Sequence, residues 1–145
     1  MIDDELLRDF GRIWPVHVSA LTEFLTACRQ SFDGDIDLFL VLCIIGDRTF
    51  SQRHVPAGLS YDAWNSLKVG EVKAEDINIQ SIAESSGIPR ETVRRKVNAL
   101  LEKGWITRDA AGAIMATEKA KRDLEPLTVS SLAYLSRMKA LFAGR

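Results

Sequence analysis

The sequence predicts a mainly α-helical protein with one small β-hairpin in its second half. Three observations support this fold class. Apolar residues recur at helical spacings near both ends of the chain, start and stop signals for two consecutive helices occupy residues 78–104, and two short apolar segments flank a turn directly afterwards. Helices should therefore form the frame of the protein, with the hairpin attached to it.

The length and composition are those of one globular domain. The chain has 145 residues, 46% of them hydrophobic and 27% charged, which argues against disorder. Its longest apolar run, residues 38–45, is far shorter than the roughly 20 residues that a membrane-spanning helix needs. Three of the first five residues are acidic, where a signal peptide would be basic. We therefore expect a cytoplasmic protein with no membrane partner.

The N-terminal third should be helical. Apolar residues at spacings of three, four and seven predict two helical pieces over residues 3–32, with a kink or break near Trp14 because Pro15 cannot donate to the helix ladder. Asp35 can cap a following helix over residues 36–45, which Gly46 would end. This segment is apolar on all sides, so we expect a fully buried helix, with Cys28 and Cys43 acting as reduced core residues.

Residues 48–76 read as a connector. Residues 56–58 indicate a loop, and Ser60 can start a short helix that runs to about Leu67. Four amphipathic aromatic residues could converge on a small-molecule effector, although such residues are more often core or interface: Trp14, His17, Tyr61 and Trp64. No metal-ligand spacing, phosphate-binding glycine loop or nucleophile elbow is present, so no cofactor and no enzymatic activity are expected.

Residues 77–116 carry the densest set of local signals. A short strand over residues 77–79 leads into an N-cap at Asn78 and a helix that stops at Gly87. Pro89 suits the first position of the next helix, which ends at Gly104 and carries one apolar face, formed by Val93, Val97, Leu100 and Leu101. Strands over residues 105–108 and 113–116 then enclose a turn at residues 109–112. Two short helices around a glycine turn, followed by a hairpin, form a winged helix-turn-helix.

Residues 81–106 resemble the winged helix-turn-helix of bacterial transcriptional regulators, most closely the GntR-type and MarR-type DNA-binding domains. The resemblance covers roughly residues 77–125, and residues 116–120 are similar to the segment with which MarR-type proteins open their dimerisation helix. It implies sequence-specific binding of double-stranded DNA by a homodimeric transcriptional regulator. MarR-type wings usually carry an aspartate and an arginine, whereas this turn offers Asp109 without a following arginine.

The charge distribution agrees with a polyanionic partner for the second half. Residues 1–76 hold 7 Lys and Arg against 13 Asp and Glu, a net charge of −6, whereas residues 77–145 hold 12 against 7, a net charge of +5. A local excess of basic residues can mark a surface that binds nucleic acid. The alternative is a solvated helix face, on which Arg94 and Arg95 pair with Glu91 and Glu102.

The helix that follows Pro89 is the predicted recognition helix. We expect Thr92, Arg95 and Asn98 to read base edges, because these side chains match donors, acceptors and methyl groups of the major groove. Other basic residues should bind DNA phosphates and so position the protein on the duplex without reading its sequence. These phosphate anchors are Arg90, Arg94, Lys96 and Arg108, the last of them on the wing. Ser81, in the first turn of the preceding helix, could add a neutral phosphate contact.

The sequence divides into four segments. Residues 1–47 would hold N-terminal helices for dimerisation and the first core helix, residues 48–76 the connector, residues 77–117 the DNA-binding core, and residues 118–145 a second dimerisation helix. Apolar stripes that could form a two-fold interface are Leu21, Phe24, Cys28 and Phe32 at one end, and Leu132, Leu135, Met138 and Phe142 at the other. Such a dimer implies a palindromic operator. Two alternatives remain: the stripes pack on each other within a monomer, or the winged helix is a protein-docking module without DNA binding.

Overall fold

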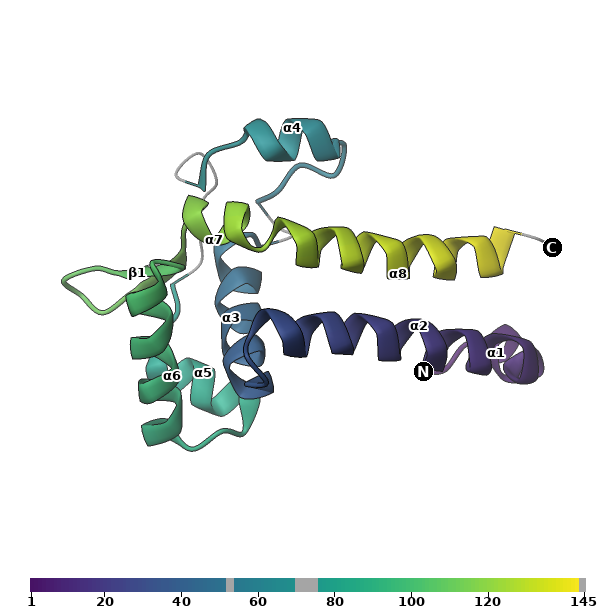
Figure 1. The fold of residues 1–145 in the computed structure, drawn as a ribbon, viewed down its shortest axis with the longest axis horizontal. Coiled ribbons are helices and arrows are strands. Elements are labelled where there is room, and N and C mark those ends of the chain that lie inside the picture. The colour runs from purple at the N-terminus through teal and green to yellow at the C-terminus, as the bar shows by residue number, and fades with distance from the viewer. Residues whose placement is uncertain (52–53, 70–75, 144–145) are drawn as a thin grey trace. The chain divides into compact units, whose positions relative to one another are not determined.

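The computed structural model describes residues 1–51, 54–69 and 76–143. The chain divides into two compact units: unit 1 comprises Met1–Gly34 and Leu124–Arg145, and unit 2 comprises Asp35–Asp123. The described residues form mostly helices and one two-stranded antiparallel sheet (Figure 1), which confirms the predicted mainly α fold with a hairpin wing. The first core helix thus belongs to the same unit as the winged helix-turn-helix.

Unit 1 consists of α1 (Asp4–Arg8), α2 (Phe10–Ser31) and α8 (Glu125–Ala143). The expected break near Trp14 is wrong. Pro15 lies inside α2, and the chain breaks instead at Asp9, which ends α1 and precedes α2. Pro15 is the sixth residue of α2, so the N–H that it lacks removes one bond of the ladder in the second turn, and the helix continues through it.

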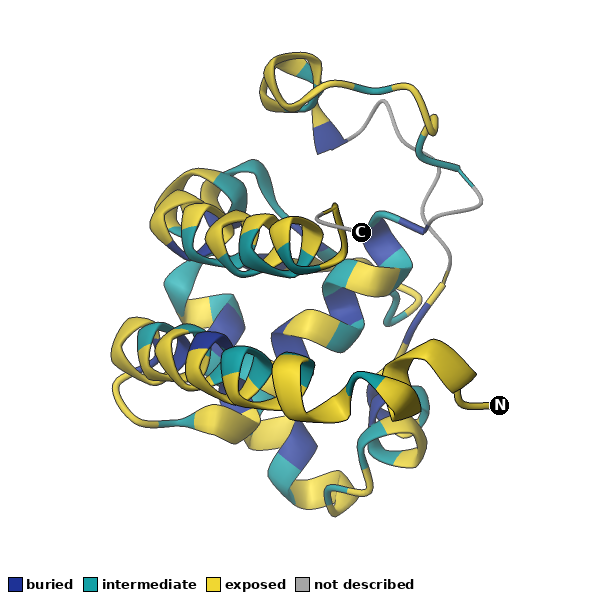
Figure 2. Ribbon diagram, turned by 90° about the vertical axis from the view of Figure 1, so that its right-hand side faces the viewer, coloured by how far each residue is buried: buried dark blue, intermediate teal, exposed yellow. Residues whose placement is uncertain are grey.

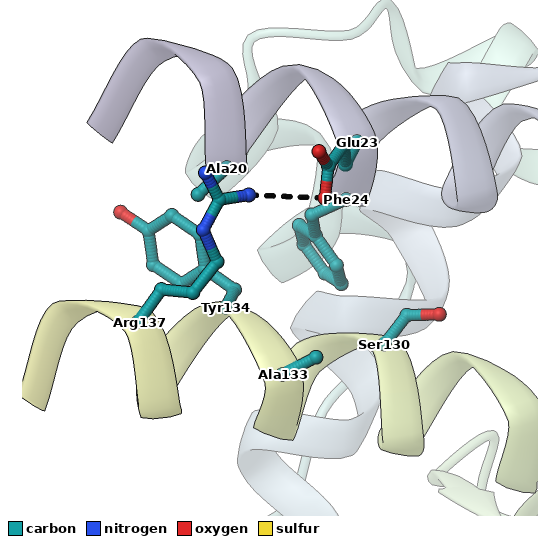
Figure 3. Close-up of a pocket in the computed structure, with 7 residues that line it drawn as sticks. All are labelled: Ala20, Glu23, Phe24, Ser130, Ala133, Tyr134 and Arg137. Carbon is teal, nitrogen blue, oxygen red and sulfur yellow. Dashed lines mark hydrogen bonds and ion pairs between the residues drawn. The ribbon is translucent and has the colours of Figure 1, made fainter. Parts of the chain in front are cut away.

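The two long helices of unit 1, α2 and α8, pack against each other. The Nδ1 atom of His17 lies 2.7 Å from the hydroxyl oxygen of Tyr134, and the rings of Phe24 and Tyr134 are 6.3 Å apart. Arg137 donates to Glu23 at 3.0 Å across the rim of a pocket of about 110 Å³, in which the rings of Phe24 and Tyr134 lie between the two helices (Figure 3). These contacts hold the two ends of the chain together.

Unit 2 is built around α3 (Ile36–Thr49), which contacts α5 (Ile79–Ser86), α6 (Arg90–Lys103) and β2 (Ile114–Ala116). As predicted, the carboxylate of Asp35 caps α3, accepting from the backbone N–H of Leu38 at 2.9 Å. Two expectations for this helix are wrong. It continues beyond Gly46, and it is not fully buried, because Leu40 and Cys43 are exposed. Cys28 is buried as expected, and burial raises the pKa of its thiol.

The remaining elements of unit 2 are α4 (Tyr61–Ser66), β1 (Ile106–Arg108) and α7 (Glu118–Asp123). The predicted cap at Ser60 is confirmed, since its hydroxyl accepts from the N–H of Ala63 at 3.1 Å. Lys121 of α7 donates to the carbonyl oxygens of Trp64 and Leu67, the latter at 2.7 Å, and its ammonium lies 4.6 Å from the centre of the Trp64 ring. The short helix of the connector is thereby attached to α7.

Thr49 ties the central helix to the wing. Its buried hydroxyl donates to the carbonyl of Ile45 at 2.9 Å and accepts from the backbone N–H of Ala116 at 2.9 Å. The side chain thus satisfies the N–H of a β2 residue from the last turn of α3. Thr49 and Ala116 are both buried, and Figure 2 colours the buried residues dark blue.

Replacing Thr49 by valine should lower the free energy of unfolding by about 1–3 kcal/mol, because the buried N–H of Ala116 would lose its acceptor while the volume stays nearly constant. Urea denaturation followed by circular dichroism measures the change. Thr26→Val is the matched control, since the hydroxyl of Thr26 also donates to the carbonyl four residues earlier but is exposed. An equal effect of the two substitutions would contradict the role of the Ala116 contact.

Candidate nucleic-acid interface

The helix-turn-helix is formed by α5 and α6. Asn78 caps α5, as predicted, by accepting from the N–H of Ser81 at 3.0 Å, and Gly87 ends it in the left-handed conformation with φ 72°. Pro89 precedes the first residue of α6, one position before the site predicted for it, and Gly104 ends α6 with φ 73°. Glycine is suited to both turns because a Cβ atom disfavours positive φ.

Apolar contacts fix the orientation of α6. Val93, Val97 and Leu100 are fully buried on one face of this helix, and Ile82 of α5 is fully buried as well. Helix α6 contacts α3, α5 and β1. The polar side of α6 is therefore the side that faces solvent.

The wing follows α6 directly. Strands β1 and β2 pair antiparallel, with Thr107 opposite Met115. The predicted strand before Asn78 is not formed, but the carbonyl of Ile77 accepts from the N–H of Ile114 at 3.1 Å and so borders β2. The carboxylate of Asp109 accepts from the N–H groups of Ala111 and Ala113, each at 2.9 Å, and closes the turn without an arginine.

The base of the wing is attached to α7. Thr117 donates its hydroxyl to the carbonyl of Gly104 at 2.7 Å and accepts from the N–H of Ala120 at 3.2 Å, so it caps α7. The indole N–H of Trp105 donates to Asp123 at 2.9 Å. Hydrogen bonds from Lys119 first and then from Trp105 lower the pKa of Asp123. The hairpin is thus anchored at both of its outer ends.

The predicted DNA-contacting residues fall into three groups in the structure. Exposed on α6 or at its start are Pro89, Arg90, Arg94, Arg95 and Asn98, and Arg108 is exposed on the wing. Thr92 and Lys96 are half-buried on α6. Ser81 is half-buried on α5, and its hydroxyl donates to the Asn78 side chain at 3.1 Å. The helix-turn-helix therefore brings the α6 residues to one surface, while Ser81 is committed to a local cap.

Two of the predicted phosphate anchors already have carboxylate partners. Arg94 pairs with Glu91 one turn earlier, as the alternative interpretation predicted, and this hydrogen bond lowers the pKa of Glu91. Lys96 donates to Asp35 of α3 at 2.7 Å. Within the described ranges, Arg90, Arg95 and Arg108 form no ion pair within 4 Å. Arg95 instead donates to the hydroxyl of Thr92 at 3.3 Å, which couples two predicted base readers.

Sequence reasoning missed the pair formed by Asp35 and Lys96. Asp35 was expected only as a helix cap, and no local pattern links it to a lysine 61 residues later. Burial raises the pKa of Asp35, but the hydrogen bonds from Lys96 and from the N–H of Leu38 outweigh it, so the pKa is lowered overall. This pair connects the recognition helix to the N-terminus of α3.

The lowered pKa of Asp35 predicts a pH-dependent effect of Lys96→Met. A carboxylate whose folded pKa is depressed stabilises the protein above its unfolded pKa of about 3.9, and this contribution is lost as the pH falls through the folded pKa. At pH 7 the variant should therefore unfold at a lower urea concentration than the natural protein. The difference between the two unfolding midpoints should shrink as the pH falls towards 3. Lys139→Met, at an exposed lysine, is the control. A gap that persists at low pH would contradict the ion-pair explanation.

The aromatic residues expected to converge on an effector are divided between the units. Trp14 and His17 belong to unit 1, with ring centres 5.5 Å apart, whereas Tyr61 and Trp64 belong to unit 2, where Trp64 packs edge-on against Phe50 at 4.7 Å. Among the described residues, no three His, Cys, Asp or Glu side chains gather as a metal site. No described helix is both long and apolar enough to cross a bilayer.

Comparison with known proteins gave a match to a protein-family model. The searches of curated proteins and of solved structures found no match to this chain. Residues 72–107 match the family model described as winged helix-turn-helix DNA-binding, a range that includes α5, the Gly87 turn and α6 and ends within β1. The match covers about a quarter of the chain. The chain therefore carries a winged helix-turn-helix DNA-binding module.

Proposed function

We propose that this protein is a cytoplasmic, homodimeric transcriptional regulator that binds a palindromic operator in double-stranded DNA through α6. The observation that carries the proposal is the exposed polar surface of α6 on a winged helix-turn-helix that matches a DNA-binding family. An α-helix fits the major groove of B-DNA, and a basic helix can approach the phosphates on either side.

Base reading is assigned to Thr92, Arg95 and Asn98. Arginine can bond bidentately to guanine and asparagine to adenine. The hydrogen bond from Arg95 to Thr92 supports this assignment, because it orients the guanidinium along the helix surface. Arg95 is also free of a carboxylate partner within the described residues, so DNA binding would not have to break an ion pair.

Phosphate binding is assigned first to Arg90 and Arg108, both exposed. Arg94 and Lys96 remain in the proposal, but each would have to leave or share a carboxylate to reach a phosphate. Pro89 would position the start of α6, and Ser81 would act through the cap that it forms with Asn78.

Dimerisation is assigned to unit 1. Large apolar side chains are exposed on α8 at Val129, Leu132 and Leu135, and on α2 at Val18. Two residues of the predicted α2 stripe, Cys28 and Phe32, are instead buried within the chain. A helix that is apolar on its outer face as well as on its packed face usually buries both. The contacts between α2 and α8 within one chain account for one face, and a second copy would cover the other. Narrower MarR-like or GntR-like membership rests on the sequence resemblance of residues 81–106.

Selection of binding sites from a randomised duplex pool, followed by sequencing, tests the proposal. Enrichment of a palindrome is the expected result. The affinity for it should fall with salt, with a slope of about −0.9 per phosphate neutralised, so the two unpaired phosphate-binding arginines in each protomer, Arg90 and Arg108, predict roughly −4 for a dimer. The absence of both enrichment and salt dependence would assign the winged helix to protein docking. Sedimentation showing only monomers at micromolar concentration would remove the dimer and the palindrome.

A further inference from the structure

A cavity of about 390 Å³ lies in unit 1 among α1, the first half of α2 and the end of α8. Sites for small molecules commonly have volumes of about 300–1,000 Å³ and mainly apolar walls. This cavity has such walls, with Leu7 from α1, Phe10 and Trp14 from α2, and Met138 and Phe142 from α8. It is distinct from the predicted aromatic cluster, of which it contains only Trp14 and His17.

Polar contacts at one end hold α1 in place against this cavity. Arg12 donates to the carboxylate of Asp9, the residue between α1 and α2, at 2.9 and 2.6 Å. The same guanidinium donates to the carbonyl of Leu141 at 2.8 Å, near the end of α8. A cation at a helix C-terminus is favourable, because the carbonyl dipoles point towards it. The corner between α1 and α2 is thus attached to α8, and the cavity is preformed.

Two side chains in the described wall can form hydrogen bonds, Trp14 through its indole N–H and His17 through its imidazole. The rings of Phe10 and Trp14 stack at 5.1 Å, and His17 continues this aromatic wall along α2. The Nδ1 atom of His17 is engaged with the hydroxyl of Tyr134 at 2.7 Å, so Nε2 is the ring nitrogen left for another partner. Among the residues that the structure describes, no charged side chain lines the cavity. A charged ligand would lose its hydration without gaining an opposite charge.

From this geometry we propose that the cavity binds an uncharged, mainly apolar small molecule with one hydrogen-bonding group, which His17 receives. The bound molecule covers the exposed faces of Leu7, Phe10 and Trp14. This binding site lies in unit 1, whereas the recognition helix belongs to unit 2, so the proposal does not depend on DNA binding.

Titration of the full-length protein with N-phenyl-1-naphthylamine, an uncharged apolar fluorescent probe, tests the inference. The expected result is saturable binding of one probe per chain. Leu7→Glu should weaken binding by about tenfold or more, because it places a carboxylate in the apolar wall. Leu25→Glu is the matched control: Leu7 and Leu25 are 57% and 44% exposed, but only Leu7 lines the cavity. The control should bind within about twofold of the natural protein.

Three results would overturn the inference. One is the absence of saturable binding, and another is an equal loss in both variants. The third is that the natural protein is a dimer that does not bind the probe, and that Leu7→Glu converts it into monomers. That result would show that a second copy covers the cavity. Phe142→Glu, on the opposite wall, repeats the test if Leu7→Glu fails to fold by near-ultraviolet circular dichroism. Equally tight binding of anionic 1-anilinonaphthalene-8-sulfonate would overturn the assignment of an uncharged ligand.

Discussion

Replacing Leu100 by alanine is expected to lower the free energy of unfolding by about 2–5 kcal/mol, the range for large-to-small substitutions in a packed core. Leu100 is 0% exposed and lies on the buried face of α6, next to the turn that leads into the wing. The substitution removes three buried carbons and leaves a cavity where the recognition helix is held. Urea denaturation at neutral pH measures the loss.

Leu40→Ala provides the control for this effect. Leu40 lies on α3 in the same unit but is 39% exposed, so its truncation should cost less than about 1 kcal/mol. If both leucines had the same effect, Leu100 would not be the packing residue that the structure indicates. The Leu100→Ala variant should also bind DNA more weakly, because part of the binding free energy would be spent on ordering α6.

Replacing Arg95 by alanine should weaken binding to the selected operator by about 1–3 kcal/mol, roughly 5- to 150-fold, and relax the preference at one base position. Arg95 is exposed on α6 and hydrogen-bonded to Thr92, in a position to present its guanidinium to a base edge. Fluorescence anisotropy with the operator and with a random duplex measures the two affinities. Binding to the random duplex should change much less.

Arg90→Ala is the comparison that separates base recognition from phosphate binding. Arg90 is the first residue of α6 and is exposed, so we expect it to contact phosphate. Its loss should weaken binding to both duplexes alike and reduce the salt slope by about one. Equal losses on the two duplexes for Arg95→Ala would remove Arg95 from the set of base readers.

Local signals predicted most of the winged helix-turn-helix. Asn78, Gly87 and Gly104 act as the caps that the sequence indicated, and Thr117 caps the helix that follows the wing. These motifs depend on hydrogen bonds between residues two to four positions apart, so the surrounding fold alters them little. The apolar face of α6 is predictable for the same reason, since its spacing is a property of one helix.

The predictions that the structure contradicts applied a local sequence rule without the position in the helix or the contacts with other elements. Pro15 does not break α2, because the proline removes only one bond of the ladder, in the second turn of the helix. Gly46 does not end α3, since Thr49 in the following turn is held by Ala116 of β2. Cys43 is exposed although its neighbours in the sequence are apolar, because one side of α3 faces away from α5 and α6.

The sequence by itself determined the order of the helices, the turn between α5 and α6, and the polar surface that α6 presents. The ion pair of Arg94 with Glu91 is local to α6 and was predictable, whereas only the tertiary structure decided that Lys96 is paired. Asp35 meets Lys96 because α3 packs against α6, and Thr49 meets Ala116 because α3 packs against β2. Contacts of this kind join residues more than 60 positions apart, and helical periodicity describes one segment at a time. It therefore contains no information about which segments meet.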